Sequence, residues 1–260
     1  MTFQPIKKQT TVYEVVKQIE DSIISGELKI GSRLPSERQM AQLLEVSRPV
    51  VRESLIVLKG KGLINMIPGK GNFINDYRVN GSLPILESLI SFQANNIDKK
   101  LIESLCATRK LIETETAYLA ANNRKKEELD ILIEINKEEH EILNKLKLNK
   151  LKDFRIENLV ELDFKFHHEV AIASGNLVYP LLLNSFKKVY TFLTSSFFSS
   201  LIKNLNDTNL NGMEDFEFVI ETHKKLIESI EKFDSKNSRK TMIKLLEHGE
   251  RLLLRNSIKN

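Results

Sequence analysis

Residues 34–74 read LPSERQMAQLLEVSRPVVRESLIVLKGKGLINMIPGKGNFI, and this stretch decides the fold of the N-terminal part of the chain. Ser36 and Gln39 have the spacing of a capping box, which predicts a short helix that begins at Ser36. Ser47 is a typical N-cap residue, and Pro49 suits the first turn of a helix, where its missing N–H costs nothing. We therefore expect a second helix to begin at Ser47 after a tight turn.

The second helix has one apolar face and one basic face. Its apolar positions are spaced i, i+4 and i+7, as a face that packs on a core requires, and they are Val51, Leu55 and Leu58. Arg48 and Arg52 lie one turn apart near the helix start, where a recognition helix touches base edges. The arginine fork pairs with guanine acceptors or with phosphate. Arginines that are simply solvated are the alternative, but the coincidence of cap, turn and arginine spacing favours DNA binding.

A hairpin is expected directly after the recognition helix. Two apolar runs, 63–67 and 72–74, flank Pro-Gly-Lys-Gly at 68–71, which is a turn composition. Glycines at the tip, such as Gly69, allow the backbone to approach DNA closely, and Lys70 adds a positive charge there. The whole stretch thus predicts a helix-turn-helix followed by a β-wing.

Residues 10–75 resemble the winged helix-turn-helix of GntR-type bacterial transcription regulators. The resemblance implies that operator DNA contacts Arg38, Ser47, Arg48, Pro49 and Arg52, and it places Gly69 at the tip of the wing. Pro49 departs from the small hydroxyl residue that is frequent there, so sequence preference is expected to differ. The matching residues are Ile24, Gly26, Leu28, Gly31, Leu34-Pro35-Ser36-Glu37-Arg38, Met40-Ala41, Val46-Ser47-Arg48, Val51-Arg52-Glu53, Leu58, Gly62-Leu63-Ile64, Gly69, Gly71 and Phe73.

Composition supports a basic DNA-binding domain that is joined to a larger neutral one. The 260 residues carry a net charge of +4. Residues 1–78 hold 12 Lys and Arg against 8 Asp and Glu, whereas residues 79–260 hold 27 of each. The chain has one cysteine, Cys106, no apolar run of membrane-helix length and no secretory signal at its start. These features favour a cytoplasmic protein that does not enter a membrane.

The rest of the chain shows only helical periodicity. We expect a winged-helix domain over 1–76, a linker over 77–84 and an all-helical domain over 85–260. Amphipathic helices with short loops predict an antiparallel bundle of six or seven helices, so the fold class is mainly α with a small β-wing. The expected helices are 84–95, 98–122, 126–148, 155–174, 177–205, 213–233 and 237–257.

A few polar residues on the apolar faces of these helices could bind a metal ion. Asp163 and His167 are spaced i, i+4 and project from one helix face. His223 and His248 lie on the apolar faces of the last two helices. One carboxylate and three imidazoles suit zinc or a metal of the nickel and manganese class. Histidines that are satisfied in the core or lie on the surface are the alternative.

Residues 98–255 resemble the helical effector domain of the FadR-like branch of the family, the FCD type. The resemblance implies that Asp163, His167 and His223 hold a divalent metal ion inside the bundle. It places the last ligand at Leu245, so we assign that role to His248, which lies one turn later, and keep a shifted site as the alternative. The other matching positions are Arg109, Ile112-Glu113, Ala117, Ala120-Ala121, Phe166, Ser174-Gly175-Asn176, Leu226 and Asp234.

A metal ion with open positions could accept a small carboxylate metabolite, and Arg109 could pair with that effector. An intrahelical pair between Arg109 and Glu113 is the alternative for this arginine. The resulting hypothesis is a homodimeric repressor that binds double-stranded operator DNA and is not an enzyme. A metal-dependent enzyme acting on small carboxylates, with an accessory DNA-binding domain, is the rival from another class. A metal-free regulator whose bundle only dimerises is the third hypothesis.

Overall fold

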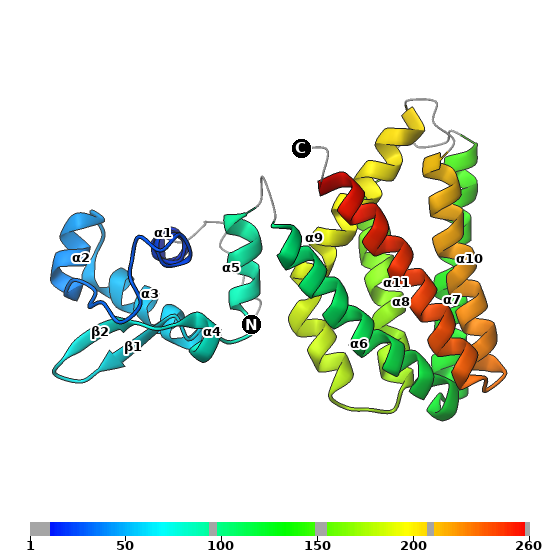
Figure 1. Ribbon diagram of the computed structural model, residues 1–260, viewed down its shortest axis with the longest axis horizontal. Helices are drawn as coiled ribbons and strands as arrows, with labels where there is room; N and C mark the ends of the chain where they lie inside the picture. The colour runs from blue at the N-terminus through cyan, green and yellow to red at the C-terminus, as the bar shows by residue number, and fades with distance from the viewer. Residues whose placement is uncertain (1–10, 94–97, 149–154, 207–210, 258–260) are drawn as a thin grey trace, which may run out of the picture. The chain divides into compact units, whose positions relative to one another are not determined.

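The protein, described here as a computed structural model, divides into two compact units, Met1–Ala94 and Asn95–Asn260. The structure describes residues 11–93, 98–148, 155–206 and 211–257, without the side chains of residues 197, 200–206, 211–212 and 255–257. Helices dominate both units, and the described residues form two strands, which confirms the predicted mainly α class with a small wing (Figure 1).

The first three helices of the described chain build the N-terminal part of the first unit. Ser36 caps the second of them through a complete capping box, in which its side chain accepts from Gln39 N and the Gln39 side chain accepts from Ser36 N. Ser47 is the N-cap of the third helix, as predicted, although its side chain makes no capping hydrogen bond. The tight turn between these helices contains Glu45 with a φ of 53°. The bounds are α1 Thr11–Ile24, α2 Glu37–Leu43 and α3 Arg48–Gly60.

The wing is an antiparallel hairpin of β1 (Ile64–Ile67) and β2 (Gly71–Ile74). Ile64 pairs with Ile74 at its base, and Ile67 pairs with Gly71 next to the tip. A bridge between Arg33 and Phe73 adds the segment before α2 to the other edge of β2. β2 is therefore paired along both of its edges, with β1 on one side and with the segment that precedes α2 on the other.

The core of this unit lies between α1, α3 and the base of the wing. It is made of the apolar faces that the sequence predicts, including Val51, Leu55 and Leu58, which are fully buried. Gly62 ends the helix-to-wing turn with a φ of +76°, and a Cβ there would lie 1.9 Å from the carbonyl oxygen of Asn80. Glycine is therefore required at this position both by its backbone conformation and by close packing.

Two short helices follow the wing and pack in the same unit: α4 (Tyr77–Asn80) and α5 (Ile85–Phe92). A buried polar cluster joins α5 to α1 and to the end of α3. Lys61 Nζ lies 2.6 Å from Glu20 Oε1, and Ser88 Oγ donates to Glu20 Oε2 at 2.7 Å. The sequence prediction made 77–84 a linker and began the helical domain at 85, whereas the structure places α5 with the winged helix.

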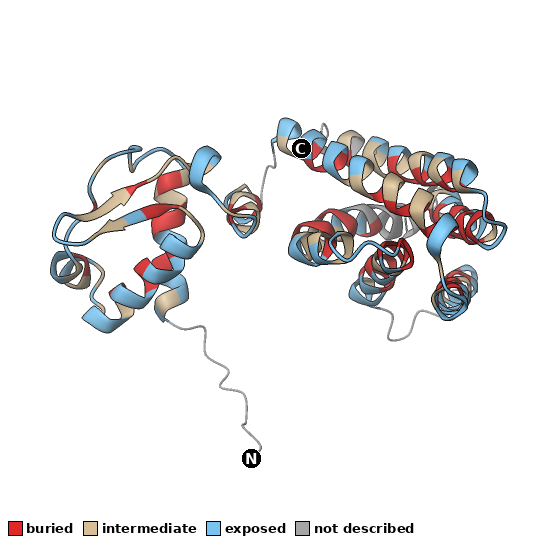
Figure 2. Ribbon diagram, turned by 90° about the horizontal axis from the view of Figure 1, so that it is seen from below, coloured by how far each residue is buried: buried red, intermediate tan, exposed pale blue. Residues whose placement is uncertain are grey.

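The described residues of the second unit form six helices, which pack as an antiparallel bundle. The long helix α6 packs against α11, α8 and α10, while α8 also contacts α7 and α9. Figure 2 shows the buried residues of each helix on the sides that face its neighbours. No helix in the described part of the chain is both long and apolar enough to cross a membrane. The bounds are α6 Lys99–Asn123, α7 Lys126–Lys147, α8 Ile156–Ala173, α9 Tyr179–Asn206, α10 Asn211–Glu231 and α11 Ser235–Ser257.

Candidate functional site

The predicted DNA-contacting residues of α2 and α3 are exposed. The buried residues of α3 turn inward, so its N-terminal end presents the opposite side to solvent. Within residues 11–93, the side chains of Arg38, Arg48 and Arg52 make neither an ion pair nor a hydrogen bond. All of the predicted helix contacts are exposed, namely Arg38, Ser47, Arg48, Pro49 and Arg52.

The tip of the wing is exposed and uses glycine where the backbone requires it. Gly69 has a φ of +73° and open space around its Cα, whereas Lys70 extends into solvent. Gly71 has a φ of +112°, and a Cβ there would lie 2.7 Å from Arg33 Nε. Lys70 on the wing and Arg33 before α2 also add positive charge to that of the α3 arginines, and positive charge favours phosphate binding.

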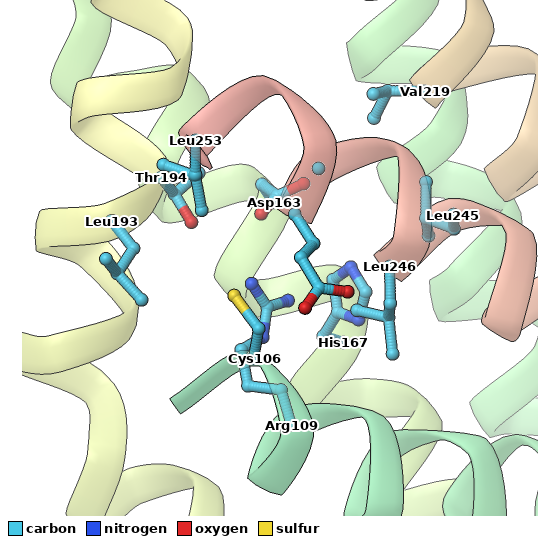
Figure 3. Close-up of a pocket in the computed structure, with 12 residues that line it drawn as sticks. Cys106, Arg109, Asp163, His167, Leu193, Thr194, Val219, Leu245, Leu246 and Leu253 are labelled. Carbon is cyan, nitrogen blue, oxygen red and sulfur yellow. The ribbon is translucent and has the colours of Figure 1, made fainter. Parts of the chain in front are cut away.

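The second unit brings together three of the four predicted metal ligands. Asp163 and His167 come from α8 and His223 comes from α10, and one potential ligand atom from each lies within 4.8 Å of the others. All three side chains are buried. Figure 3 shows Asp163 and His167 beside a cavity in the bundle. The i, i+4 spacing on α8 achieves this because it places both residues on one face.

Each of these three residues has a second polar partner further from the centre. Glu113 contacts His167 Nδ1, and Tyr190 donates its hydroxyl proton to Asp163 Oδ2 at 2.5 Å. His223 Nδ1 lies 2.8 Å from Glu139 Oε1. Histidines that bind a metal ion usually donate their other ring N–H to a carboxylate in this way.

The buried charges of this site balance one another. Burial alone would raise the pKa of Glu113, but the neighbouring Arg109 and His167 lower it to about 2. Burial likewise opposes the charged form of Arg109, and the Glu113 carboxylate outweighs it and raises the pKa of the guanidinium. For His223, burial is again outweighed, here by Glu139, so that its pKa is raised. A metal ion would compete with a proton for the Nε2 atom of His223, because only a deprotonated ring nitrogen can bind a metal ion.

The donor set fits a divalent metal ion. His223 Nε2 is fully buried and has no hydrogen-bond partner. An unpaired polar atom in the interior is costly, which is an argument for a ligand at that point. Two imidazoles and a carboxylate, which leave further coordination positions open, are a typical zinc-type set.

His248 lies apart from these three residues. Its Nε2 is 3.1 Å from Asp215 Oδ1, and its ring packs against Phe218 at a centroid distance of 4.2 Å. Leu245 and Leu246 instead line the wall of α11 that faces the cavity. The structure therefore differs from the assignment of His248 as the fourth ligand, because the phase of α11 turns this side chain toward α10.

The cavity beside the three residues has a volume of about 50 Å³. Its polar lining includes Arg109, the residue for which the sequence leaves two alternatives. The Arg109 Nε donates to Glu113 Oε1 at 2.6 Å, so the intrahelical pair exists, and the guanidinium lies over the Tyr190 ring at 4.0 Å. The lining residues are Cys106, Arg109, Asp163, His167, Leu193, Thr194, Val219, Leu245, Leu246, Gly249, Glu250 and Leu253.

Sequence reasoning missed the role of the outer partners. The sequence indicates Glu113 only as a partner of Arg109, and Tyr190 is not among the expected site residues. Glu139 was not singled out, although its helix, α7, buries an otherwise unexplained polar pair, Asn136 and Glu139, at i and i+3. Burying polar groups is costly unless they have partners, so a polar pair on the apolar face of a helix is a signal in the sequence that could have identified Glu139.

Family models match both units of the chain. The model of the gntR family of bacterial regulatory proteins matches residues 11–74, and the FadR C-terminal domain matches residues 75–240. The second match covers most of the bundle and the two helices that follow the wing. Both agree with the resemblance that the sequence motifs indicate.

Similar proteins are transcription regulators rather than enzymes. The HTH-type transcriptional regulator Mce2R of Mycobacterium tuberculosis is 30% identical over 190 residues, which are 73% of this chain and 74% of that protein. The fatty acid metabolism regulator protein of Klebsiella pneumoniae is 30% identical over 198 residues, 75% of each chain. The corresponding protein of Shewanella denitrificans is 29% identical over 71% of each.

A solved structure supports the fold over nearly the whole length. Lar, which controls the expression of the Listeria monocytogenes agr system, aligns with a TM-score of 0.59 and 16% identity, over 96% of this chain and 99% of that one. At this identity the likeness concerns the fold alone. The two family models, together with the 30% identity to Mce2R over most of both chains, show that the chain belongs to the GntR family of bacterial regulatory proteins, in the branch that carries a FadR-type C-terminal domain.

Proposed function

We propose that this protein is a homodimeric repressor that binds double-stranded operator DNA, and that its helical unit binds a divalent metal ion and a small carboxylate effector. The observation that carries the DNA-binding part is the exposed, unpaired set of arginines at the start of α3. The observation that carries the sensing part is the buried group of Asp163, His167 and His223 beside a cavity.

The first unit would read DNA with α3 in the major groove. Arg48 and Arg52 lie one turn apart on its exposed face, so both can reach the same short run of base pairs or the flanking phosphates. Arg38 near the start of α2 and Lys70 on the wing would bind the backbone on either side. One such helix reads only a few base pairs, so a two-fold dimer on a palindromic site is needed for a specific affinity.

In the second unit, Asp163, His167 and His223 would hold the metal ion. When bound, the ion would offer open coordination positions to a carboxylate. Arg109 would help to orient that carboxylate, because Glu113 engages only its Nε and one terminal nitrogen and a guanidinium has five N–H donors. If the effector binds one of two arrangements of the dimer more tightly than the other, its binding would shift the equilibrium toward that arrangement.

The size of the cavity supports a short effector. A water-sized group needs about 10–15 Å³, so a cavity of about 50 Å³ accommodates only a few such groups. A carboxylate with a short chain fits this space, whereas an extended fatty acid would require the wall to open. The fatty acid metabolism regulators among the relatives make that comparison worth including in a ligand screen.

DNA binding is tested with an Arg48→Ala/Arg52→Ala double variant on the protein's own upstream DNA at one fixed salt concentration. Each bidentate base contact is worth about 1–3 kcal/mol, so a loss of at least 30-fold in affinity is expected. A Lys224→Ala/Lys225→Ala variant is the matched control, because it removes two exposed positive charges from the other unit. Wild-type affinity in the arginine variant would refute the proposed reading helix.

Metal and effector binding are tested by metal analysis and thermal unfolding of the whole protein. Wild-type protein is expected to hold one divalent ion per chain, and His167→Ala is expected to lose it. His140→Ala is the control, since this partly exposed histidine pairs with Glu221 at the surface. A carboxylate that binds the native state raises the unfolding midpoint by mass action. Stable, metal-free wild-type protein would instead support a bundle that only dimerises.

A further inference from the structure

The most buried polar cluster of α7 lies behind His223. Both carboxylate oxygens of Glu139 face the Nδ1 atom of this imidazole, Oε1 at 2.8 Å and Oε2 at 3.1 Å. Glu139 is 4% exposed and His223 is 0% exposed. Because α7 supplies the glutamate and α10 supplies the histidine, this contact also joins two helices of the bundle at the level of the candidate metal site.

Asn136 fixes the orientation of this glutamate. Its Nδ2 donates to Glu139 Oε2 at 2.9 Å and to the backbone carbonyl of Ile220 at 3.2 Å. The amide therefore connects the glutamate to α10, close to His223 itself. A carboxylate that is held by a second buried group cannot rotate away from the imidazole without leaving polar atoms unpaired.

An ionised carboxylate only accepts hydrogen bonds, so a hydrogen bond between such a carboxylate and this imidazole requires the proton on His223 Nδ1. In the neutral imidazole the lone pair is then on Nε2, which is the buried atom without a partner. The same residue contributes its ligand atom to the group with Asp163 and His167. In this tautomer, His223 offers the lone pair of Nε2 to a metal ion bound between the three residues.

We propose that Glu139 is a positioning residue that selects the Nδ1–H tautomer of His223 and aims Nε2 at a divalent metal ion, with Asn136 holding Glu139 in place. This inference rests on the metal site proposed above. It assigns to Glu139 a role that differs from that of Glu113, because Glu113 also neutralises the buried Arg109. Among the described residues, Glu139 makes side-chain hydrogen bonds only to Asn136 and His223.

The test uses the full chain with Co²⁺ as the probe, in competition with a chromophoric chelator at one pH. Glu139→Gln keeps the size of the side chain and removes its charge. Outer partners of metal ligands contribute about 10–100-fold to affinity, so a fall of that size is expected, with an altered visible spectrum of the bound Co²⁺. Glu138→Gln is the matched control, because Glu138 is the exposed neighbour on the same helix.

Two further measurements separate positioning from a general loss of stability. Nitrogen-15 spectra of the metal-free protein are expected to show the Nδ1–H tautomer of His223 in the wild type and a mixture in Glu139→Gln, with His223→Gln identifying the signals. Asn136→Ala keeps the glutamate and loosens it, so its Co²⁺ affinity is expected to fall between those of the wild type and Glu139→Gln. This variant carries the test if Glu139→Gln does not fold.

The outcomes distinguish this inference from the function on which it rests. Wild-type Co²⁺ affinity and an unchanged tautomer in Glu139→Gln would overturn the role of Glu139 and leave the metal site standing. Absence of Co²⁺ binding by the wild type itself would remove the proposed metal site and this inference with it.

Discussion

Glu113 is a charged side chain with no exposed surface, and the burial of its charge is explained by its two partners. It meets the guanidinium of Arg109 on its own helix and the imidazole of His167 on α8. Buried charges persist only when they are paired, and removing one member leaves the other uncompensated. Glu113 is thus a structural requirement of the bundle as well as part of the candidate site.

We predict that Glu113→Gln destabilises the metal-free protein by about 3–5 kcal/mol, because the Arg109 charge would remain buried without its partner. Glu115→Gln is the control from the same helix: it breaks a half-exposed pair with Arg239, and such pairs contribute about 0–1 kcal/mol. Urea unfolding with a common slope measures both. Equal midpoints for the two variants would contradict the buried-pair argument.

Residue identities in the site were predictable where helix spacing alone decides them. Asp163 and His167 lie one turn apart, so any helix places them together. His248 depended on the length of the loop before α11 and on the phase of that helix, and here the structure turns Leu245 and Leu246 toward the cavity instead. The pattern of α7 indicates that Glu139 is unusual, but its partner His223 could not be assigned from the sequence because it lies 84 residues away on another helix.

Among the elements, the wing is the one whose contribution to DNA binding we expect to depend on a single side chain, Lys70. Its two strands are held by their mutual pairing and by the bridge to Arg33, so the tip is a firm support for Lys70. A lysine in such a place contacts phosphate rather than base edges, and its contribution is therefore independent of sequence.

We predict that Lys70→Ala weakens binding to specific and unrelated DNA by the same factor. The slope of log affinity against log salt should decrease by about 1, since one phosphate contact is lost. Lys224→Ala, in the other unit, should leave the slope unchanged. If Lys70→Ala changed the preference between two operator sequences, the wing would be reading bases, contrary to this prediction.

Helix boundaries followed from capping residues, whereas the assignment of α5 did not. Ser36 caps α2 through the capping box that the sequence predicts, and Asp98 caps α6 by accepting a hydrogen bond from Lys100 N. The apolar spacing of 85–92 was enough to predict a helix there. Its attachment to α1 depends on a hydrogen bond between Ser88 and Glu20, which are 68 residues apart, and no local pattern encodes such a contact.

For the molecule as a whole, the distribution of charge along the chain agrees with a division of function. The basic excess lies in residues 1–78, which carry the exposed arginines, and residues 79–260, which have no net charge, contain the enclosed polar site. An interface with DNA depends on positive charge and on counterion release. A neutral bundle adds nothing to that attraction and is free to contribute through assembly and ligand binding.

We predict that light scattering finds a species of twice the 29.9 kDa chain mass at micromolar concentration, and that the species persists on operator DNA. The reason is geometric, because two recognition helices must be presented about 34–36 Å apart to read two half-sites. DNA with one half-site removed should bind far more weakly at equal salt. A monomer that bound both DNAs equally would exclude the proposed two-fold arrangement.

The buried cluster of Glu20, Lys61 and Ser88 has a mechanical consequence. It joins α5 to α1 and to the end of α3 through one ion pair and two hydrogen bonds. An eight-residue helix such as α5 is about 12 Å long, and it forms the last element of the first unit. Because Glu20 and Ser88 are buried, α5 cannot separate from α1 without leaving polar groups of the cluster unpaired, which would cost free energy.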